Sequence, residues 1–279
     1  MSMVSLRDIL CDASVKGYAV GMFDVVNTES LKAIINGAEE CDSPVIIALA
    51  EAHLPYAPLE LMAPMMVDAA KRSNVPVAVH LDHGMNYSTI LKCIHYGFSS
   101  VMFDGSSLDY QSNIDGTREV VKAAKVFGVS VEAELGHVGG TEAVWNDDHP
   151  EYYTDPELAG DFVEMTGIDA LAVAIGTAHG EYIKKPCLDF DRLSAIQNKV
   201  LIPLVLHGGS GLSDQDFKEC INRGIRKINI FTEMSYAAAA GATKLIEERG
   251  KIHCFELSEA IEQKMKEVVI GKIRLFSGN

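Results

Sequence analysis

Short apolar segments rich in β-branched residues alternate along the chain with longer segments whose apolar residues recur at helical spacing. Several short segments are apolar almost throughout, as expected of parallel strands covered on both faces. The predicted strands are residues 18–25, 44–50, 75–83, 99–104, 129–136, 170–176, 203–208 and 225–232. Helical patterns occupy, among others, residues 5–13, 30–40, 59–72, 117–127, 213–223, 233–248 and 257–273.

This alternation repeats eight times, and no Pro/Gly/Ser-rich linker or block of like charge interrupts it. The pattern favours one α/β domain, a (β/α)8 TIM barrel, over two doubly wound domains. We expect residues 1–279 to form this single domain, with a helix before the first strand and an extra C-terminal helix. Residues 139–156 form the weakest connection, and a loop this long in a compact domain is usually functional.

The composition is that of an ordinary globular protein, with 48% hydrophobic and 23% charged residues among 279. No apolar run reaches the roughly 18 residues that a membrane span needs. The first ten residues contain Arg7 and Asp8 and lack the apolar core of a signal peptide. We therefore expect a cytoplasmic protein that does not associate with membranes.

The net charge bears on the class of partner, and the cysteine spacing bears on the state of the thiols. A net charge of −15 argues against a nucleic-acid surface, although a local pocket for a small phosphate stays compatible with it. The six cysteines are scattered without a C-x-x-C pair, so we interpret them as reduced, mostly structural thiols.

Histidines and carboxylates follow several of the predicted strands, at the end where a (β/α)8 barrel carries its active site. His83, His179 and His207 follow three different strands and could converge on one cation, leaving a position open for substrate. Imidazole ligands suit Zn²⁺, while Co²⁺, Mn²⁺ and Fe²⁺ remain compatible. Glu134 and Asp104 lie on the same rim. They could bind the same ion or a second one, or Glu134 could form an internal salt bridge.

Glycine-rich turns after the last strands predict a phosphate site, because barrels commonly bind phosphate with the loops after strands seven and eight. Backbone N–H groups, a hydroxyl and one ammonium group could surround the anion. These residues are Gly180, Lys184, Gly208, Gly209, Ser210, Asn229, Ile230, Phe231 and Thr232. The alternative is that the glycines only turn the chain.

A divalent cation beside a phosphate pocket suggests a phosphorylated carbonyl substrate whose carbon–carbon bond is cleaved or formed next to the carbonyl. Asp82 could move the proton of the acceptor hydroxyl, provided that a turn at the strand end lets it face the site beside His83. A Schiff-base route needs a lysine near the site. Lys227 lies inside the barrel but near the start of its strand, at the wrong end.

Seven segments in this order resemble the class II, metal-dependent fructose-bisphosphate and tagatose-bisphosphate aldolases. They are HLDHG at 80–84, VMFDGS at 101–106, EAELG at 132–136, GGTE at 139–142, AIGTAHG at 174–180, LHGGSG at 206–211 and KINI at 227–230. The resemblance extends over nearly the whole chain. It implies a TIM-barrel lyase that releases dihydroxyacetone phosphate and an aldehyde, and a homodimer or homotetramer with the last helices as candidate interface.

The resemblance also implies roles for individual residues. The three histidines correspond to the ligands of a catalytic Zn²⁺, and Asp82 to the acid/base on the hydroxyl of the bond-forming carbon. Asp104 and Glu134 match positions associated with an additional or displaced cation, divalent or monovalent. Glu142 matches the group that takes a proton from the ketose phosphate. The site for dihydroxyacetone phosphate corresponds to Gly180, Gly208, Gly209, Ser210, Asn229 and Thr232.

Four departures from the family pattern bear on the substrate. Asp24 replaces an asparagine, Ala50 a serine, and Phe231 an aspartate that is frequent in the fructose enzymes. Residues 253–256 read HCFE where a Pro-Arg pair usually precedes the last helix, its arginine binding the second phosphate. Without that guanidinium a second phosphate loses a bidentate partner. We therefore expect an unphosphorylated aldehyde, and hence a ketose 1-phosphate substrate.

Two alternatives stay open. A bisphosphate aldolase or a deoxy-keto-sugar-acid phosphate aldolase could bind its second anion through Arg274 or Lys272. A non-catalytic sugar-phosphate binding protein is suggested by Asp24 and Ala50, although the presence of Asp82 and the three histidines favours an enzyme.

Overall fold

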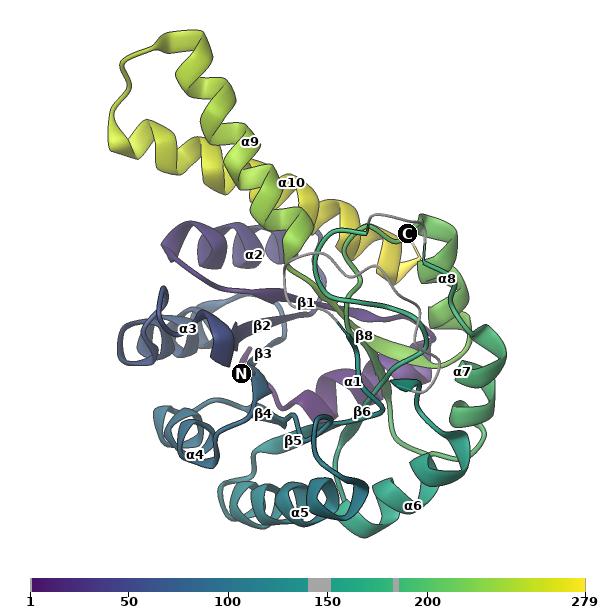
Figure 1. Ribbon diagram of the computed structural model, residues 1–279. Coiled ribbons are helices and arrows are strands. Elements are labelled where there is room, and N and C mark those ends of the chain that lie inside the picture. The colour runs from purple at the N-terminus through teal and green to yellow at the C-terminus, as the bar shows by residue number, and fades with distance from the viewer. Residues whose placement is uncertain (1, 140–151, 183–185, 279) are drawn as a thin grey trace.

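The computed structural model describes residues 2–139, 152–182 and 186–278. At its centre lies a closed barrel of eight parallel strands in sequence order, in which β8 also pairs with β1 (Figure 1). The predicted (β/α)8 barrel is thereby confirmed. The strands are β1 (Val20–Asp24), β2 (Val45–Ala50), β3 (Val77–Gly84), β4 (Ser100–Phe103), β5 (Ser130–Leu135), β6 (Ala170–Val173), β7 (Leu204–Leu206) and β8 (Ile225–Ile230).

Helices surround the barrel and pack their apolar faces on its outside (Figure 1). They are α2 (Thr28–Glu40), α3 (Leu59–Arg72), α4 (Tyr87–Tyr96), α5 (Tyr110–Phe127), α6 (Pro156–Thr166), α7 (Phe190–Gln197) and α8 (Asp214–Asn222). Helix α5 begins seven residues before its predicted start. The side chain of Asp109 accepts a hydrogen bond from the Ser112 amide and caps the helix there.

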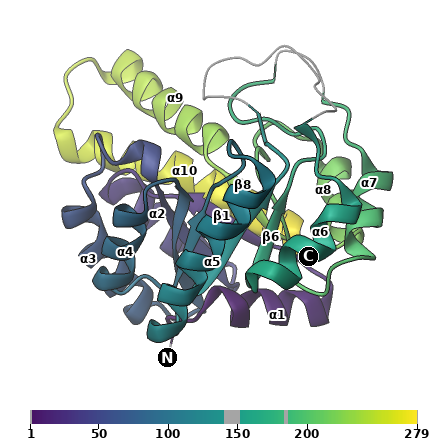
Figure 2. The same ribbon diagram turned by 60° about the horizontal axis from the view of Figure 1, so that its bottom comes forward.

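The N-terminal helix α1 (Leu6–Lys16) lies across the N-terminal ends of the strands (Figure 2). Its buried residues, such as Leu6 and Leu10, join the apolar side chains of the barrel interior, including Met22 and Val205, in one cluster. Gly17 in the left-handed conformation ends the helix and turns the chain into β1. This end of the barrel is therefore filled by apolar packing.

The last two helices form a hairpin that extends beyond the barrel (Figure 1). Helix α9 (Thr232–Arg249) begins at the rim, and α10 (Cys254–Ser277) returns along it and packs on α2. The extra C-terminal helix expected from the sequence is present and is longer than predicted. Among the described helices, no segment has the length and apolar character needed to cross a membrane.

Candidate functional site

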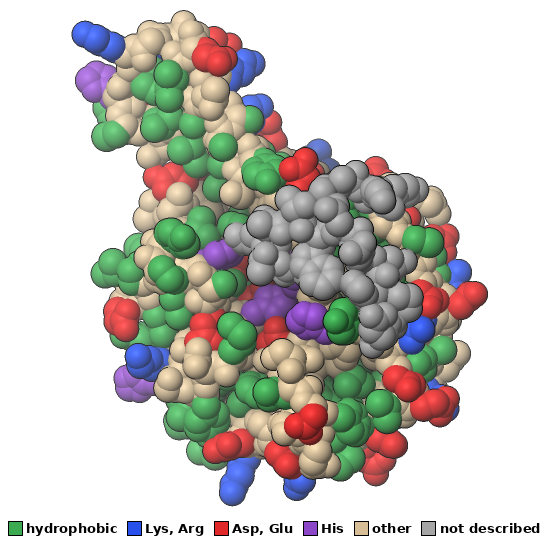
Figure 3. Space-filling view, in the orientation of Figure 1, with side chains coloured by type: hydrophobic (Ala, Val, Ile, Leu, Met, Phe, Trp, Pro, Cys, Tyr) green, Lys and Arg blue, Asp and Glu red, His purple; other side chains and the backbone are tan. Residues whose placement is uncertain are grey.

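A cavity of about 700 Å³ opens at the C-terminal ends of the strands. Figure 3 shows histidine side chains in the hollow at this end of the molecule. Many of the predicted site residues line the cavity, namely Asp82, His83, Asp104, His179, Gly180, Gly208, Gly209, Ser210, Asn229, Phe231 and Thr232.

Strand β3 ends irregularly, and this irregularity places two consecutive side chains at the cavity. His83 has a left-handed φ of +45°, and the pairing of β3 with β4 shifts register between Leu81 and Gly84. Side chains normally alternate between the two faces of a strand, so Asp82 and His83 could not otherwise both line the cavity. The sequence predicts a turn at the strand end that lets Asp82 face the site. The structure contains this turn as a left-handed His83 and a shift in register.

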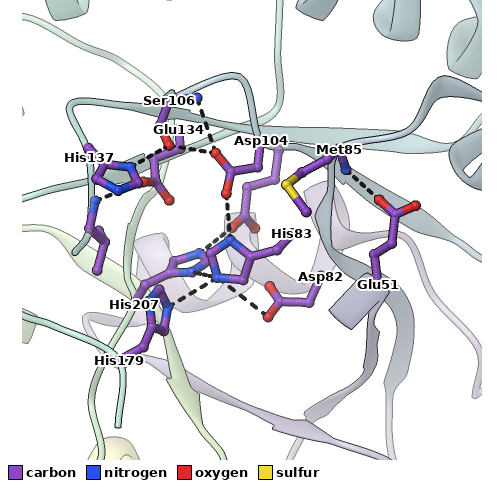
Figure 4. A network of polar contacts seen from close by, with 12 residues as sticks. Glu51, Asp82, His83, Met85, Asp104, Ser106, Glu134, His137, His179 and His207 are labelled. Atoms are coloured by element: carbon purple, nitrogen blue, oxygen red, sulfur yellow. Dashed lines mark hydrogen bonds and ion pairs between the residues drawn. The ribbon is translucent and has the colours of Figure 1, made fainter. Parts of the chain in front are cut away.

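The turn after β3 is held by a carboxylate from the neighbouring strand end. Glu51, in the short helix η1 (Glu51–His53) after β2, accepts hydrogen bonds from the backbone amides of Met85 and Asn86 (Figure 4). Its other oxygen accepts from the Asn86 side-chain amide at 2.8 Å. These bonds fix Met85 and Asn86, and they thereby hold the turn in which His83 has its uncommon backbone conformation.

Nitrogen atoms of the three predicted histidines meet at one point (Figure 4). His83 Nε2 lies 3.1 Å from His179 Nε2 and 2.9 Å from His207 Nδ1. In a tetrahedral zinc site each ligand nitrogen lies 2.0–2.1 Å from the ion, which puts neighbouring nitrogens about 3.3 Å apart. The three imidazoles therefore fit a divalent cation, and they form one of the groups whose ligand atoms lie within 4.8 Å of one another.

Two of these rings use their second nitrogen to contact a carboxylate. His83 Nδ1 lies 2.8 Å from Asp104 Oδ2, and His207 Nε2 lies 2.9 Å from Glu132 Oε1. Hydrogen bonds of this kind orient a metal-binding histidine and leave the lone pair of its other nitrogen for the cation. Asp104 is held in turn by the Ser106 hydroxyl at 2.7 Å, which also contacts His137.

The local electrostatics favour a positive charge at this point. Burial opposes a charge on His83, yet the surrounding carboxylates, Asp82 first, outweigh it and raise the pKa of His83 to about 10. The pKa of His179 falls to about 4, because burial and the charge of His83 both oppose its protonation. One positive charge is therefore stabilised between these rings, and a second positive charge beside it is not.

Glu134 lies beside His83 and Asp104, and the three make a second group suited to a cation. Burial, and then repulsion by Asp104, raise the pKa of Glu134 to about 8. One of its oxygens accepts from the Val138 amide at 2.9 Å, while the other is buried and has no hydrogen-bond partner among the described residues. An unsatisfied buried carboxylate oxygen of this kind also fits a cation nearby.

Asp82 is almost fully buried yet lines the cavity. Its Oδ1 accepts a hydrogen bond from the Asn229 side-chain amide at 3.1 Å, and its Oδ2 lies 3.8 Å from His83 Nε2. Burial alone would raise the pKa of Asp82, but the neighbouring histidines, His83 first, outweigh it and lower the pKa. The carboxylate is therefore ionised and able to accept a proton.

The side of the cavity formed after β6, β7 and β8, here called the β7–β8 side, consists of Gly180, Gly208, Gly209, Ser210 and Thr232. Thr232 is the first residue of α9, so a helix N-terminus, whose first N–H groups have no partner within the helix, opens on the cavity. Backbone amides at a helix N-terminus favour an anion.

Close packing of two loops holds this side in place. Gly208 has a φ of +67°, and a Cβ added there would lie 2.4 Å from the Ala178 carbonyl oxygen. The Tyr182 hydroxyl donates to the Gly208 carbonyl at 2.8 Å and accepts from the Ala178 amide at 2.9 Å. The same loop that carries His179 is thus tied to the glycine-rich turn.

The neighbouring side, here called the β1–β2 side, consists of Asp24, Ala50, Ala52, His53 and Tyr56. It differs in character, since it presents a carboxylate, two methyl groups and two polar rings. Phe231 lies between the two sides, with its ring 4.4 Å from the ring of His53. Among the described residues that line the cavity, none is a lysine or an arginine.

Several predicted residues lie elsewhere. Ile230 does not line the cavity, because strand alternation turns its side chain into the core outside the barrel. Lys227 is fully buried beneath the site, as its place in the strand implied. Glu142 and Lys184 lie outside the described residues. The alternative cation Lys272 contacts Glu233 at 2.8 Å, and it is absent from the cavity lining.

Sequence reasoning missed several residues that the structure brings to the site. Glu51, His53 and Tyr56 follow β2 directly, a position that could have drawn attention to them. Tyr182 and Glu132 act through hydrogen bonds to the glycine-rich turn and to His207. Their partners are distant in sequence, so no local pattern indicates those contacts.

Comparison with known proteins agrees with this geometry. The sequence profile of the family "Fructose-bisphosphate aldolase class-II" matches residues 4–279. A protein of Bacillus subtilis strain 168 named "Probable fructose-bisphosphate aldolase" is 41% identical over 290 residues, covering 100% of this chain and 99% of its own length.

A protein of Escherichia coli strain K12, YdjI, is 42% identical over 269 residues, covering 96% of this chain and 95% of its own length. The crystal structure of the YdjI aldolase from the same organism superposes with a TM-score of 0.87 at 38% identity. That match covers 98% of this chain and 97% of the other. The chain therefore belongs to the class II fructose-bisphosphate aldolase family of lyases.

Proposed function

We propose that the protein is a Zn²⁺-dependent aldolase that cleaves a ketose 1-phosphate reversibly to dihydroxyacetone phosphate and an unphosphorylated aldehyde. The observation that carries the proposal is one cavity in which three converging histidines and an ionised aspartate adjoin a glycine-rich turn and a helix N-terminus. Family membership supports the reaction type.

His83, His179 and His207 would hold the cation. When bound, it would polarise the ketose carbonyl and offset the negative charge that bond cleavage leaves on it. The carboxylates on the outer nitrogens of His83 and His207 orient the two rings. Glu134 and Asp104 would serve a second or displaced cation, as the sequence resemblance implies.

Asp82 would act as the base in the cleavage direction. Its ionised carboxylate takes the proton from the hydroxyl on the carbon that becomes the aldehyde, and it returns that proton when the bond is formed. Asn229 holds one carboxylate oxygen of Asp82 and leaves the other toward the cavity. The group that protonates the other product is predicted to be Glu142.

The phosphate of the ketose would lie on the β7–β8 side. Backbone N–H groups of the glycine-rich turn, the Ser210 hydroxyl and the N-terminus of α9 suit a dianion there. The Ser210 hydroxyl also accepts a hydrogen bond from the Glu233 amide of α9 at 3.4 Å, so the glycine-rich turn and the helix N-terminus lie side by side. Lys184 would add an ammonium group, and this part of the proposal stays a prediction.

The β1–β2 side supports the choice of a monophosphate substrate. Asp24 lines the cavity on the side where this proposal puts the distal part of the sugar, and a carboxylate there would repel a second phosphate. Hydroxyl groups of an uncharged aldehyde can instead donate to Asp24. The absence of lysine and arginine from the described lining gives a bisphosphate no counter-charge on this side.

The test is a zinc analysis of the purified protein combined with a cleavage assay that detects dihydroxyacetone phosphate. Ketose 1-phosphates and ketose 1,6-bisphosphates are compared at equal concentration, before and after treatment with a chelator. We expect release from the monophosphates alone, its loss on chelation and its recovery with Zn²⁺.

Other outcomes separate the parts of the proposal. Release chiefly from bisphosphates would retain the mechanism and reject the substrate assignment. Metal binding without release from either class would favour the sugar-phosphate binding protein. A homo-oligomer and a cytoplasmic location remain predictions from the sequence.

A further inference from the structure

Beneath the three histidines lies a buried ion pair that takes no part in the reaction described above. Glu132 on β5 and Lys227 on β8 are both fully buried. Lys227 Nζ lies 3.0 Å from Glu132 Oε1 and 2.9 Å from Oε2, so the ammonium group spans both carboxylate oxygens. Neither residue lines the cavity, so neither touches the substrate.

The pair is connected to the site through one ring. Glu132 Oε1, which accepts a hydrogen bond from the Lys227 ammonium group, also lies 2.9 Å from His207 Nε2. The opposite nitrogen of that ring, Nδ1, is the one that meets His83 and His179. The proton on His207 therefore points at Glu132, and the lone pair on Nδ1 points to the place of the cation.

The pair lies among both polar and apolar side chains, and His80 and Asp82 have ligand atoms within 4.8 Å of Glu132. The apolar side chains of the barrel interior around it include Val20, Met22 and Val205. Replacing a buried ion pair by apolar residues of similar size is often neutral or stabilising. The pair is therefore weak evidence for a role in stability, whereas an apolar pair could not accept the proton of His207.

We propose that the Lys227–Glu132 pair is a positioning device for the metal ligand His207. Glu132 accepts the Nε2 proton and fixes both the tautomer and the orientation of the ring. Lys227 holds the two oxygens of Glu132 in place and supplies the counter-charge that a buried carboxylate needs. This inference rests on the proposed metal site.

The nearby His80 cannot replace Lys227 in this role. Its Nε2 lies 3.7 Å from Glu132 Oε2, beyond hydrogen-bond distance, and its Nδ1 contacts the Ser100 hydroxyl at 2.9 Å. Burial, and then the ammonium of Lys227, lower the pKa of His80 well below its usual value, so the ring is neutral. Lys227 is therefore the cation that faces Glu132.

The test compares two double variants that both remove the two charges and so leave no unpaired ion in the core. Glu132→Gln with Lys227→Met keeps a carbonyl oxygen that can accept from His207. Glu132→Leu with Lys227→Met has the same charge and nearly the same volume but no acceptor. Thermal unfolding and circular dichroism establish that both variants are folded.

The readout is the Zn²⁺ dissociation constant, measured by competition with a chelator, together with the visible spectrum of the Co²⁺-loaded proteins. We expect the leucine variant to bind Zn²⁺ about 10–100-fold more weakly than the wild type, as for the loss of other partners of metal-binding histidines. Its Co²⁺ spectrum should change, and the glutamine variant, which keeps an acceptor but lacks the ammonium group that holds it, should lie between the leucine variant and the wild type in both readouts.

Equal Zn²⁺ affinities for the two variants would overturn the inference, because the hydrogen-bond acceptor would then have no effect. Failure of the wild-type protein to bind Zn²⁺ would instead reject the proposed metal site itself. The metal-binding readout does not depend on the identity of the sugar, so an error in the substrate assignment leaves this test intact.

Discussion

The two sides of the cavity are built in different ways. The β7–β8 side consists of backbone and small groups whose positions are fixed by close contact, as Gly208 is against Ala178. The β1–β2 side consists of side chains, among them Asp24 and Ala50 at the ends of β1 and β2 and His53 at the end of η1. If the proposed substrate binds here, backbone groups would bind its phosphate end, which ketose 1-phosphates share, and side chains would select its variable end.

The largest effect should come from Asp82, which lines the cavity at the end of β3 and contacts Asn229 of β8. Replacing it with Ala removes the base without touching the three histidines, so kcat should fall by about 10²–10⁴-fold. Zinc content and binding of dihydroxyacetone phosphate should persist, which equilibrium dialysis and calorimetry can measure. Turnover within a few-fold of the wild type would mean that another group moves the proton.

Gly208→Ala tests whether the β7–β8 side is fixed by close contact. A left-handed alanine costs about 1–3 kcal/mol, and its Cβ would meet the Ala178 carbonyl, so kcat/KM should fall by about 10–100-fold for every substrate. Gly128→Ala is the matched control, since Gly128 has a φ of +69° at the end of α5 with no atom within 4 Å. If both variants lose activity equally, the loss reflects general destabilisation and not the site.

Asp24→Asn tests whether the β1–β2 side selects by charge. Removing the carboxylate should raise the ratio of kcat/KM for a ketose 1,6-bisphosphate to that for the 1-phosphate by about tenfold, since about 1.4 kcal/mol of repulsion is lost. Asp115→Asn, an exposed change on α5, removes the same charge far from the cavity and should leave the ratio unchanged. A constant ratio in both variants would exclude Asp24 as a selecting group.

The smallest effect is expected from Ala50→Ser. A hydroxyl at the end of β2 gives a phosphate one donor, and a single hydrogen bond of about 0.5–1.5 kcal/mol changes the same ratio by about two- to tenfold. In the double variant, the effects of Ala50→Ser and Asp24→Asn on the free energy that corresponds to this ratio should be close to additive if each acts on the substrate separately. If Ala50→Ser instead favours the monophosphate further, this interpretation of the side is contradicted.

Much of the barrel and of the metal site could be predicted from the sequence. The strands are apolar runs, and each histidine follows one of them, so the strand order alone brings His83, His179 and His207 to one rim. Helix starts were less predictable. The early start of α5 depends on the capping hydrogen bond of Asp109, and the polar first turn lacks the apolar spacing that a pattern detects.

The remaining parts of the site depend on contacts that have no sequence signature. The left-handed conformation of His83 occurs without a glycine, so only the turn, and not its form, could be expected. The position of Ile230 between Asn229 and Phe231 predicts a place in the substrate site, but alternation along β8 turns its side chain outward. Tyr182 reaches Gly208 across 26 positions of the chain, and such pairing follows only from the folded structure.

The backbone inversion at His83 also has a dynamic consequence. A regular strand turns only every second side chain toward the barrel interior, whereas β3 places the proposed base Asp82 and the proposed metal ligand His83 at the cavity from adjacent positions. The two groups share one peptide unit and therefore move together. The spacing between the proposed base and the proposed metal ligand is therefore set by one strand end and does not depend on the positions of other loops at the rim.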